Sequence, residues 1–417
     1  MISVLVVDDS VVVRRLIVDA LTDAPDITVV GTAANGLIAQ SKIDTLKPDV
    51  VTMDIEMPEM DGITAVRELR KRHRLLPVIM FSTLSAAGAS ATLEALSAGA
   101  TDYVTKPSNV GSIAESTAAV REQLIPRIHA LAGRRGSGGA PPRSASPRPS
   151  TAPERPDTAA PRPGAVPGRP GLSGPGPSGP GSNGLDATRP GAGRPGMAAA
   201  GPASAAPRAG NRAKGGRIDI LAIGSSTGGP DALTAVLTAL PGDLPVPVVI
   251  TQHMPPVFTK MFAERLNRVT AVTVVEATDD MPVEPGTVYI APGDRHLTLH
   301  RRGTAVLTKL NGGPPENSCR PAVDVMFRSV SALYGAAVYA AVLTGMGADG
   351  RAGAKVLRDA GAEVLAQDEA TSVVWGMPGA VVGAGQADAV LPLDRIAGAL
   401  VQRATVGRGA RSAAVTR

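Results

Sequence analysis

The sequence predicts an α/β protein with two doubly wound parallel-sheet domains joined by a disordered linker. Residues 1–124 and 217–404 alternate short apolar runs with segments whose apolar residues recur at helical spacing, and strands that alternate with helices pair in parallel. Residues 134–216 hold almost no bulky apolar residue, so they cannot bury enough surface to offset the entropy of ordering. We therefore expect a Pro-, Gly- and Arg-rich linker over 125–216 and a frayed polar tail over 405–417.

The first region is predicted to form five strands, each followed by a turn or a helix. Its strand-like runs are short and apolar, and several end in polar residues. The predicted strands are Ser3–Val7, Ile27–Ala33, Val50–Met53, Pro77–Ser82 and Asp102–Thr105, and the predicted helices are Val11–Thr22, Gly36–Leu46, Gly62–Arg72 and Ala86–Ala98.

The second region repeats this alternation. Some antiparallel pairing is expected around residues 272–310, where strand-like runs follow one another without a helix. The predicted strands are Ile218–Ile223, Val246–Thr251, Val272–Glu276, Thr287–Ala291, Val338–Leu343 and Glu363–Ala366, and the predicted helices are Asp231–Leu240, Val257–Asn267, Val323–Tyr334 and Gly350–Ala360.

Composition argues against several classes of protein. The formal charge is +5, but Arg and Lys outnumber acids mainly within 134–216, which has no aromatic residue for base stacking, so we expect no nucleic-acid partner. Cys319 is the single cysteine, which excludes a disulfide within the chain. Residues 1–10 do not have the pattern of a signal peptide, and no run of 18 apolar residues occurs. We expect a cytoplasmic protein without membrane insertion.

Polar residues follow the predicted strands of the first region. Asp8, Asp9 and Asp54 come at the carboxyl ends of the first and third strands, which is the edge where open α/β sheets bind ligands. Three converging carboxylates suit Mg²⁺, which prefers hard oxygen ligands and bridges to phosphate. Asp54 could then accept a phosphoryl group, with Ser82 binding a phosphoryl oxygen and Lys106 neutralising its charge.

These residues lie in stretches that resemble the receiver domain of two-component response regulators, a flavodoxin-like fold. The matching stretches are VLVVDDS, VTMDIEMPEMDG, PVIMFST and DYVTKP, and the resemblance covers residues 1 to about 124. It implies that a histidine kinase is the phosphodonor for Asp54, that Mg²⁺ supports this phosphorylation, and that Ser82 and Tyr103 act as the switch pair.

A Gly-rich turn opens the second region. Gly224, Ser226 and Gly228 have the spacing of a nucleophile elbow between a strand and a helix. A dinucleotide-binding turn would need glycine at position 226, and a phosphate-binding P-loop would need a lysine where Pro230 stands. The elbow is therefore favoured, with Ser226 as the nucleophile and the amides of the following helix as donors to an anion.

A serine nucleophile needs a base and an orienting acid. His253 and His296 each follow an apolar strand, and His253 is favoured because its strand comes next in sequence after the elbow. Asp349 stands in a Gly-rich turn after a third strand, and it could orient the base, cap a helix, or do both. Weaker candidates for the acid are Asp294, Asp324 and Asp368.

The second region resembles the protein-glutamate methylesterases of chemotaxis, with a Rossmann-like catalytic domain. The matching stretches are IGSSTGGP, TQHMPP, APGDRHL, CRPAVDVMF, LTGMGADG and VVWGMPGAV. The resemblance implies hydrolysis of glutamate methyl esters on the cytoplasmic domains of chemoreceptors, and deamidation of certain receptor glutamines. It also implies roles for Ser226, His253 and Asp349 as nucleophile, base and acid, and for Thr227 and Met346 as active-site contacts, the Met346 amide being an oxyanion donor.

The chain departs from this family pattern in two places. The linker is much longer than the family's usual connector, and Cys319 and Ala322 stand where other polar residues are common. Two rival functions are a DNA-binding output domain and a nucleotide-binding scaffold. The first is disfavoured because residues 217–404 are rich in strands, and the second because the turn at 224–229 has no lysine.

Overall fold

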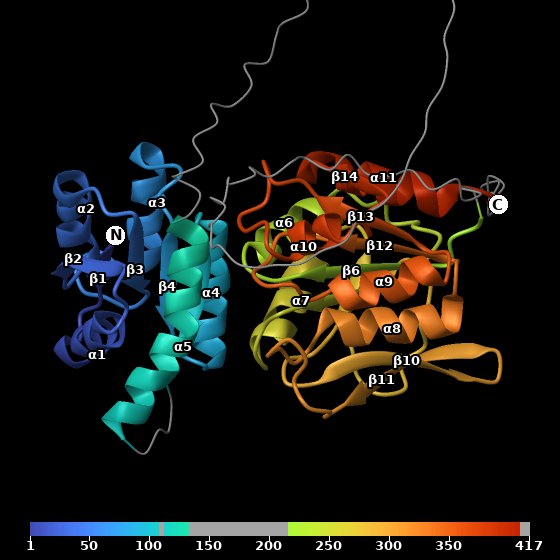
Figure 1. Ribbon diagram of the computed structural model, residues 1–417, viewed down its shortest axis with the longest axis horizontal. Helices are drawn as coiled ribbons and strands as arrows, with labels where there is room; N and C mark the ends of the chain where they lie inside the picture. Colours follow the sequence, from blue (N-terminus) through green and yellow to red (C-terminus); the bar gives the residue numbers. More distant parts are fainter. Residues whose placement is uncertain (108–111, 133–215, 409–417) are drawn as a thin grey trace, which may run out of the picture. The chain divides into compact units, whose positions relative to one another are not determined.

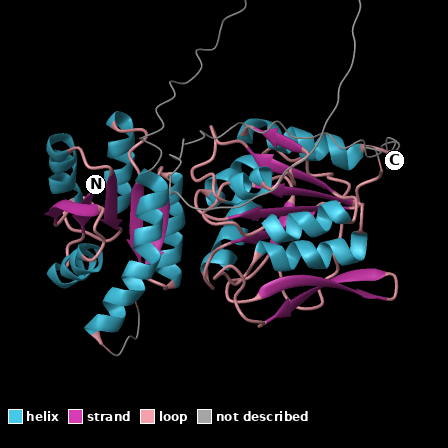
Figure 2. Ribbon diagram, viewed as in Figure 1, coloured by secondary structure: helices cyan, strands magenta, loops and turns pink. Residues whose placement is uncertain are grey.

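The computed structural model describes residues 1–107, 112–132 and 216–408. It contains two parallel sheets, each with helices on both faces (Figures 1 and 2). This confirms the predicted fold class. Most of the predicted linker and most of the predicted tail lie outside the described residues. Among the described residues, no helix is both long enough and apolar enough to cross a membrane.

The first sheet has five parallel strands in the order β2-β1-β3-β4-β5. Its strands are β1 (Ile2–Val7), β2 (Ile27–Ala33), β3 (Val50–Asp54), β4 (Val78–Ser82) and β5 (Asp102–Thr105), and its helices are α1 (Val11–Thr22), α2 (Gly36–Leu46), α3 (Gly62–Arg72), α4 (Ala86–Ser97) and α5 (Ile113–Ala132).

Successive side chains of β1 pack against helices on opposite faces of the first sheet. Val4 and Val6 pack with residues of α1 and α5, whereas Leu5 and Val7 pack with residues of α2, α3 and α4. Successive side chains of a strand point to opposite faces, so a strand buried on both faces reads as a continuous apolar run.

Helix α5 corrects one predicted boundary. It runs from Ile113 to Ala132, so residues 125–132, which were assigned to the linker, continue the helix. Leu124, Ile128 and Leu131 are buried at helical spacing, and this apolar stripe packs against the core even though Pro126 lies within the helix.

The second sheet has seven parallel strands in the order β14-β13-β12-β6-β7-β9-β8. Its strands are β6 (Ile220–Ser225), β7 (Val248–Gln252), β8 (Thr273–Glu276), β9 (Thr287–Ile290), β12 (Val338–Val342), β13 (Glu363–Gln367) and β14 (Ala389–Leu391), and its helices are α6 (Gly229–Thr238), α7 (Phe258–Val269), α8 (Val323–Tyr334), α9 (Arg351–Asp359), α10 (Met377–Gly383) and α11 (Leu393–Thr405).

Two helical layers enclose this second sheet. Leu221 and Ile223 of β6 pack in the cluster that contains α6, α7 and α11, and Ile220 and Ala222 pack in the cluster that contains α8, α9 and α10. The expected antiparallel pairing occurs in the hairpin of β10 (His296–Arg302) and β11 (Ala305–Asn311) and in an isolated bridge between Pro282 and Leu307, whereas β8 and β9 pair in parallel.

The two sheets belong to one compact unit. Tyr103 of β5 stacks on Phe258 of α7 with ring centroids 5.0 Å apart. Arg265 of α7 donates a hydrogen bond of 3.1 Å to the carbonyl of Leu93 in α4 and another to Ser97 Oγ. These contacts connect the last strand and the fourth helix of the first sheet to the second sheet.

Candidate active site

The turn after β6 presents Ser226 at the carboxyl edge of the second sheet. Its amide donates to the carbonyl of Thr344 (3.0 Å), and its carbonyl accepts from the amide of Gly229 (2.7 Å). Gly228 has φ 75°, a conformation that glycine adopts without strain. A side chain on Gly345 would come within 2.9 Å of Ser226 Cβ, so the neighbouring loop can approach the serine only because it has a glycine there.

Three neighbouring strands lead to the three predicted catalytic residues. β6 lies between β7 and β12 in the sheet, so connections leave it in both directions. This is the topological switch point at which open α/β sheets bind their ligands. Ser226 follows β6, His253 follows β7, and Asp349 lies in the loop after β12.

His253 and Asp349 are in direct contact. His253 Nε2 lies 2.8 Å from Asp349 Oδ2, and the side chain of His253 is 12% exposed. The alternative histidine, His296, is committed elsewhere: its Nε2 lies 3.0 Å from the Pro314 carbonyl and its Nδ1 accepts from the Ala322 amide at 3.2 Å. His296 therefore holds a loop in place, and His253 is the histidine positioned beside a carboxylate.

The Asp349 carboxylate is surrounded by donors. Oδ2 accepts from the Val323 amide at 2.6 Å, and Oδ1 accepts from the Asp324 amide at 3.0 Å and the Gly350 amide at 2.9 Å. Val323 and Asp324 begin α8, whose N-cap residue Ala322 makes no side-chain cap hydrogen bond. Asp349 thus supplies the acceptor for the first turn of α8 from a distant loop.

Electrostatics couples the acid to the histidine. Burial raises the pKa of Asp349. The hydrogen bonds from His253 and from backbone amides lower this pKa by a larger amount, so it lies below the usual value. Burial lowers the pKa of His253, but Asp349 and the nearby Cys319 thiol raise it to about 9. The pair therefore favours a carboxylate facing an imidazolium.

The weaker candidates for the acid serve other contacts. Asp294 pairs with Arg320 (2.9 Å), and Asp368 accepts from the amide and hydroxyl of Thr371 in a turn. Asp324 is buried beside Asp349 and accepts from the Gly353 amide at 2.6 Å. For Asp294, Asp324 and Asp368, no hydrogen bond to His253 occurs within the described residues.

The acidic residues of the first sheet come together as predicted. One oxygen from each of Asp8, Asp9 and Asp54 lies within 4.8 Å of the others. Asp8 and Asp54 are buried, and burial, together with the charge of Asp54, raises the pKa of Asp8 to about 6. Asp8 Oδ2 is buried, makes no well-aligned hydrogen bond among the described residues, and has Lys106 Nζ as an ion-pair partner at 3.3 Å. Three converging carboxylates with hard oxygen ligands fit a divalent cation such as Mg²⁺.

The three other predicted residues lie on or directly after the strands β4 and β5. Lys106 Nζ lies 2.8 Å from Asp54 Oδ1 and 3.3 Å from Asp8 Oδ2. Ser82 is turned towards α4, where its hydroxyl donates to the Gly88 carbonyl at 3.2 Å and accepts from Thr92 at 2.6 Å. Tyr103 is buried against Phe258, and this burial raises the pKa of its hydroxyl.

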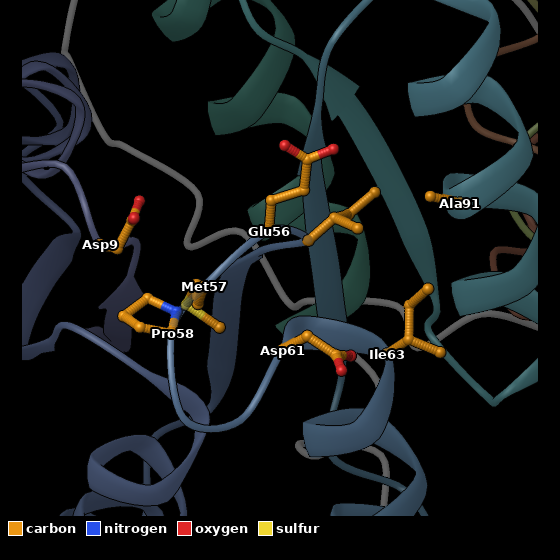
Figure 3. A pocket seen from close by; sticks show the side chains of 8 residues that line it. Asp9, Glu56, Met57, Pro58, Asp61, Ile63 and Ala91 are labelled. Carbon is orange, nitrogen blue, oxygen red and sulfur yellow. The ribbon is translucent and has the colours of Figure 1, made fainter.

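A hollow of about 710 Å³ opens beside the acidic cluster. Its lining combines the acidic side chains of Asp9, Glu56 and Asp61 with apolar ones (Figure 3). Because Ile55, which directly follows Asp54, also lines it, the hollow gives access to the loop that carries the predicted phosphorylation site.

Comparison with known proteins identifies the family. The CheB methylesterase family model matches residues 221–400, and the response regulator receiver domain model matches residues 4–118. A protein-glutamate methylesterase/protein-glutamine glutaminase from a Nocardioides strain is 49% identical over 96% of this chain and 95% of its own. The chain belongs to the CheB methylesterase family.

Two further proteins are similar to this methylesterase-family chain. A protein-glutamate methylesterase/protein-glutamine glutaminase of Trichodesmium erythraeum is 40% identical over 96% of this chain and 98% of its own. The crystal structure of the Thermotoga maritima CheB methylesterase catalytic domain is 44% identical, with a TM-score of 0.44, and covers 44% of this chain and 98% of its own.

Thr227 and Met346 flank the elbow of this family member. Thr227 donates from Oγ1 to Asp102 Oδ2 of β5 at 2.8 Å, and its carbonyl accepts from Thr344 Oγ1 at 2.9 Å. Among the described residues, no hydrogen bond involves the backbone amide of Met346. The role of that amide as an oxyanion donor stays a prediction.

Sequence reasoning missed two contacts in this site. Cys319 was treated as an ordinary thiol, yet its Sγ lies 3.4 Å from His253 Nδ1. Asn317 was not considered, yet its Nδ2 donates to Asp349 Oδ1 at 2.8 Å and to Asp324 Oδ2 at 3.0 Å. Both residues lie in an irregular loop, so no periodic pattern could have placed them.

Proposed function

We propose that this chain hydrolyses methyl esters of glutamate side chains on the cytoplasmic domains of chemoreceptors, and that it deamidates specific receptor glutamines. The observation that carries the proposal is the 2.8 Å contact of His253 Nε2 with Asp349 Oδ2, on strands that flank the Ser226 elbow. Family membership supports the same reaction, because relatives are named protein-glutamate methylesterase/protein-glutamine glutaminase.

In the first step, Ser226 Oγ attacks the ester carbonyl and His253 takes its proton. Since Asp349 binds Nε2, the nitrogen left to take that proton is Nδ1, which lies 3.4 Å from Cys319 Sγ, the reverse of the arrangement in the serine proteases. Asp349 fixes the ring and stabilises the imidazolium, and it does not itself take the proton. The amides of Thr227 and Met346 are the donors to the developing oxyanion.

In the second step, the C–O bond to the methoxy group breaks and His253 protonates the leaving group, which departs as methanol. Water then attacks the acyl-Ser226 ester, His253 again removes and returns a proton, and a free glutamate side chain is released. A glutamine side chain follows the same course with ammonia as the leaving group. Attack by Ser226 and attack by water each need a neutral His253 at their start, whereas departure of the leaving group needs the protonated ring.

We further propose that phosphorylation of Asp54 by a histidine kinase controls this activity. Asp8, Asp9 and Asp54 would hold Mg²⁺, which when bound neutralises the charge that develops on a transferred phosphoryl group. Lys106 already pairs with Asp54, and it can move to a phosphoryl oxygen. Ser82, now bonded towards Gly88 and Thr92, can turn to a second phosphoryl oxygen.

Contacts between the sheets support a route from Asp54 to the elbow. Tyr103, the predicted partner of Ser82, stacks on Phe258 of α7. The adjacent residue Asp102 accepts a hydrogen bond from Thr227, which directly follows the nucleophile. A rearrangement of β5 on phosphorylation would therefore act on the residue beside Ser226. The inhibited state keeps these contacts, and phosphorylation weakens them.

The direct test is release of methanol from methyl-labelled receptor membranes, measured with and without a small-molecule phosphodonor. We expect release by the unmodified chain and faster release with the phosphodonor. An Asp54→Asn chain should retain the basal rate and lose the response. If no methanol appears under either condition, the proposed activity is wrong. If it appears at the same rate under both conditions, only the proposed control is wrong.

A further inference from the structure

The loop 316–319 brings an amide side chain over two buried carboxylates. Glu316 and Cys319 are bonded to each other in both directions, amide to carbonyl, at 3.0 and 2.9 Å. Asn317 and Ser318 between them both have positive φ, 53° and 60°. This is the pattern of a two-residue type I′ turn, in which asparagine is one of the few residues other than glycine that fits.

The turn is anchored at its first residue. The Glu316 carboxylate receives two hydrogen bonds from Arg328 of α8, at 2.7 and 2.5 Å. This bidentate pair ties the loop to the helix that also presents its first amides to Asp349. The direction of the Asn317 side chain is thus set by the backbone of the turn and by the helix beneath it.

Asn317 bridges two acids with one amide group. Asp349 and Asp324 are both almost fully buried, and Asn317 Nδ2 donates to an oxygen of each. An –NH₂ group has two hydrogens, so both bonds can form at once. For Asp324 Oδ2, no second hydrogen-bond donor occurs among the described residues, whereas Asp349 Oδ1 has two backbone amides besides.

We infer that Asn317 is a positioning residue for the hydrolase reaction: it holds the Asp349 carboxylate in line with His253 and offsets the negative charge of the adjacent Asp324. The inference rests on the proposed function of the same site. Asn317 touches no reacting atom, and it acts through Asp349.

The charges around Asp349 and Asp324 decide whether Asn317 raises or lowers the pKa of His253. The titratable groups around Asp349 and Asp324 are His253, Cys319, Glu316, Arg328 and His296. The donor hydrogens of Asn317 reduce the negative potential that the two carboxylates exert on His253. Without them the imidazolium is more stable, so a higher pH is needed to form the neutral base.

Two substitutions at this position and one control test the inference on the full chain. Asn317→Gly removes the amide but keeps a residue that accepts positive φ, and Asn317→Asp replaces the donor with a third carboxylate. Ser318→Gly is the matched control, because it changes the neighbouring positive-φ residue and leaves both acids untouched. Turnover of methylated receptor is measured as kcat and KM against pH, and the His253 ring is titrated by NMR.

We expect the acid limb of kcat to move to higher pH in Asn317→Gly and further in Asn317→Asp, with little change in KM. At neutral pH the rate should fall roughly tenfold, the size expected for a shift of about one unit. Ser318→Gly should keep the wild-type limb. An unshifted limb in Asn317→Gly, or an equal shift in Ser318→Gly, would overturn the inference.

The NMR titration separates this inference from the proposed function. Its readout is the ionisation of the His253 ring, assigned by loss of the signal in His253→Gln, and it does not depend on turnover. If the chain has no esterase activity but the His253 titration still moves between wild type and Asn317→Gly, the proposed function fails and the positioning role stands. If turnover is normal and the titration does not move, the positioning role fails alone.

Discussion

The chain contains two clusters of buried carboxylates, and they differ in how their oxygens are satisfied. Around Asp349, one side-chain amide, three backbone amides and His253 all point at the carboxylate. Around Asp8 and Asp54, the hydrogen-bond donors are fewer, and Lys106 is the positively charged partner of both carboxylates. The first cluster is complete with protein groups alone. The second is the site proposed to bind a cation.

The pKa directions express the same contrast. Burial raises the pKa of Asp8 and of Asp54, and the opposing effect of Lys106 does not offset it. Burial acts in the same direction on Asp349, but its donors outweigh it and the pKa falls. A buried carboxylate surrounded by donors is a fixed charge suited to orienting a base. A buried carboxylate with few hydrogen-bond donors is suited to binding a metal ion. The surroundings of a buried carboxylate therefore indicate its role.

The largest effect is expected at the nucleophile. Ser226→Ala should reduce methanol release by roughly four orders of magnitude or more, because the neighbouring hydroxyls of Ser225 and Thr227 are buried and bonded to Gln252 and Asp102. Thermal unfolding should change little, since a small side chain at the sheet edge is shortened. Residual activity within tenfold of wild type would show that Ser226 is not the nucleophile.

Substitutions of His253, His296 and Asp349 test the carboxylate cluster around Asp349. His253→Gln should be nearly as inactive as Ser226→Ala, and Asp349→Asn less severely affected, because the base is needed for proton transfer and the acid only orients it. His296→Gln should mainly lower the unfolding temperature, since it breaks two loop hydrogen bonds. Loss of turnover in His296→Gln with retention in His253→Gln would reverse the assignment.

A smaller effect, on the unfolding temperature, is expected for Asp8 of the acidic cluster, and it depends on pH. The folded pKa of Asp8, about 6, is above its usual value of 3.8. The stability that Asp8 contributes is therefore present below pH 4 and lost as pH rises through about 6. Without divalent cations, Asp8→Asn should unfold at a higher temperature than wild type at pH 7 and at a similar temperature at pH 4.

Added Mg²⁺ should remove that difference. It should raise the unfolding temperature of the wild-type chain at pH 7 and have a smaller effect on Asp8→Asn. Equal stabilisation of both chains would mean that Asp8 takes no part in binding the cation.

The sequence predicted those parts of the molecule in which a pattern has a direct structural meaning. Apolar runs predicted the strands of both sheets except β14, and the order of strands predicted that the strand before His253 lies next to the elbow strand, as the pairing of β6 with β7 bears out. The resemblance to known families added Thr227 and Met346. Such elements can be recognised in a sequence because apolar residues recur along strands and helices at a fixed spacing.

The sequence could not show contacts that depend on loops. Asp349 was expected, as one possibility, to cap the helix after it, and instead it accepts the first amides of α8, which precedes it in the chain. Asn317 and Cys319 reach the site through a tight turn. Helix α5 was not among the predicted helices, and its last residues were assigned to the linker, because a helix boundary next to a Pro-rich segment has no sharp signal.

The smallest predicted effect concerns contacts between the two sheets, and it tests whether the two clusters communicate. Arg265→Ala removes the hydrogen bonds to the Leu93 carbonyl and Ser97 Oγ of α4, and leaves the elbow, the triad and the acidic cluster intact. The matched control is Arg268→Ala, which removes the same charge from an exposed position of the same helix.

If the contacts between the sheets restrain the hydrolase, loss of those hydrogen bonds should raise the basal rate of the unphosphorylated chain. A hydrogen bond contributes about 0.5–1.5 kcal/mol once the bonds to water that it replaces are subtracted. If other contacts between the sheets make up part of the loss, removing two such bonds corresponds to a rise in rate of roughly two- to tenfold. The phosphorylated rate should stay the same, because that state no longer depends on the restraint, and the ratio of the two rates should fall. Arg268→Ala should leave both rates unchanged. An unchanged basal rate in Arg265→Ala would show that this contact does not restrain the enzyme, and an equal rise in both variants would assign the effect to charge alone.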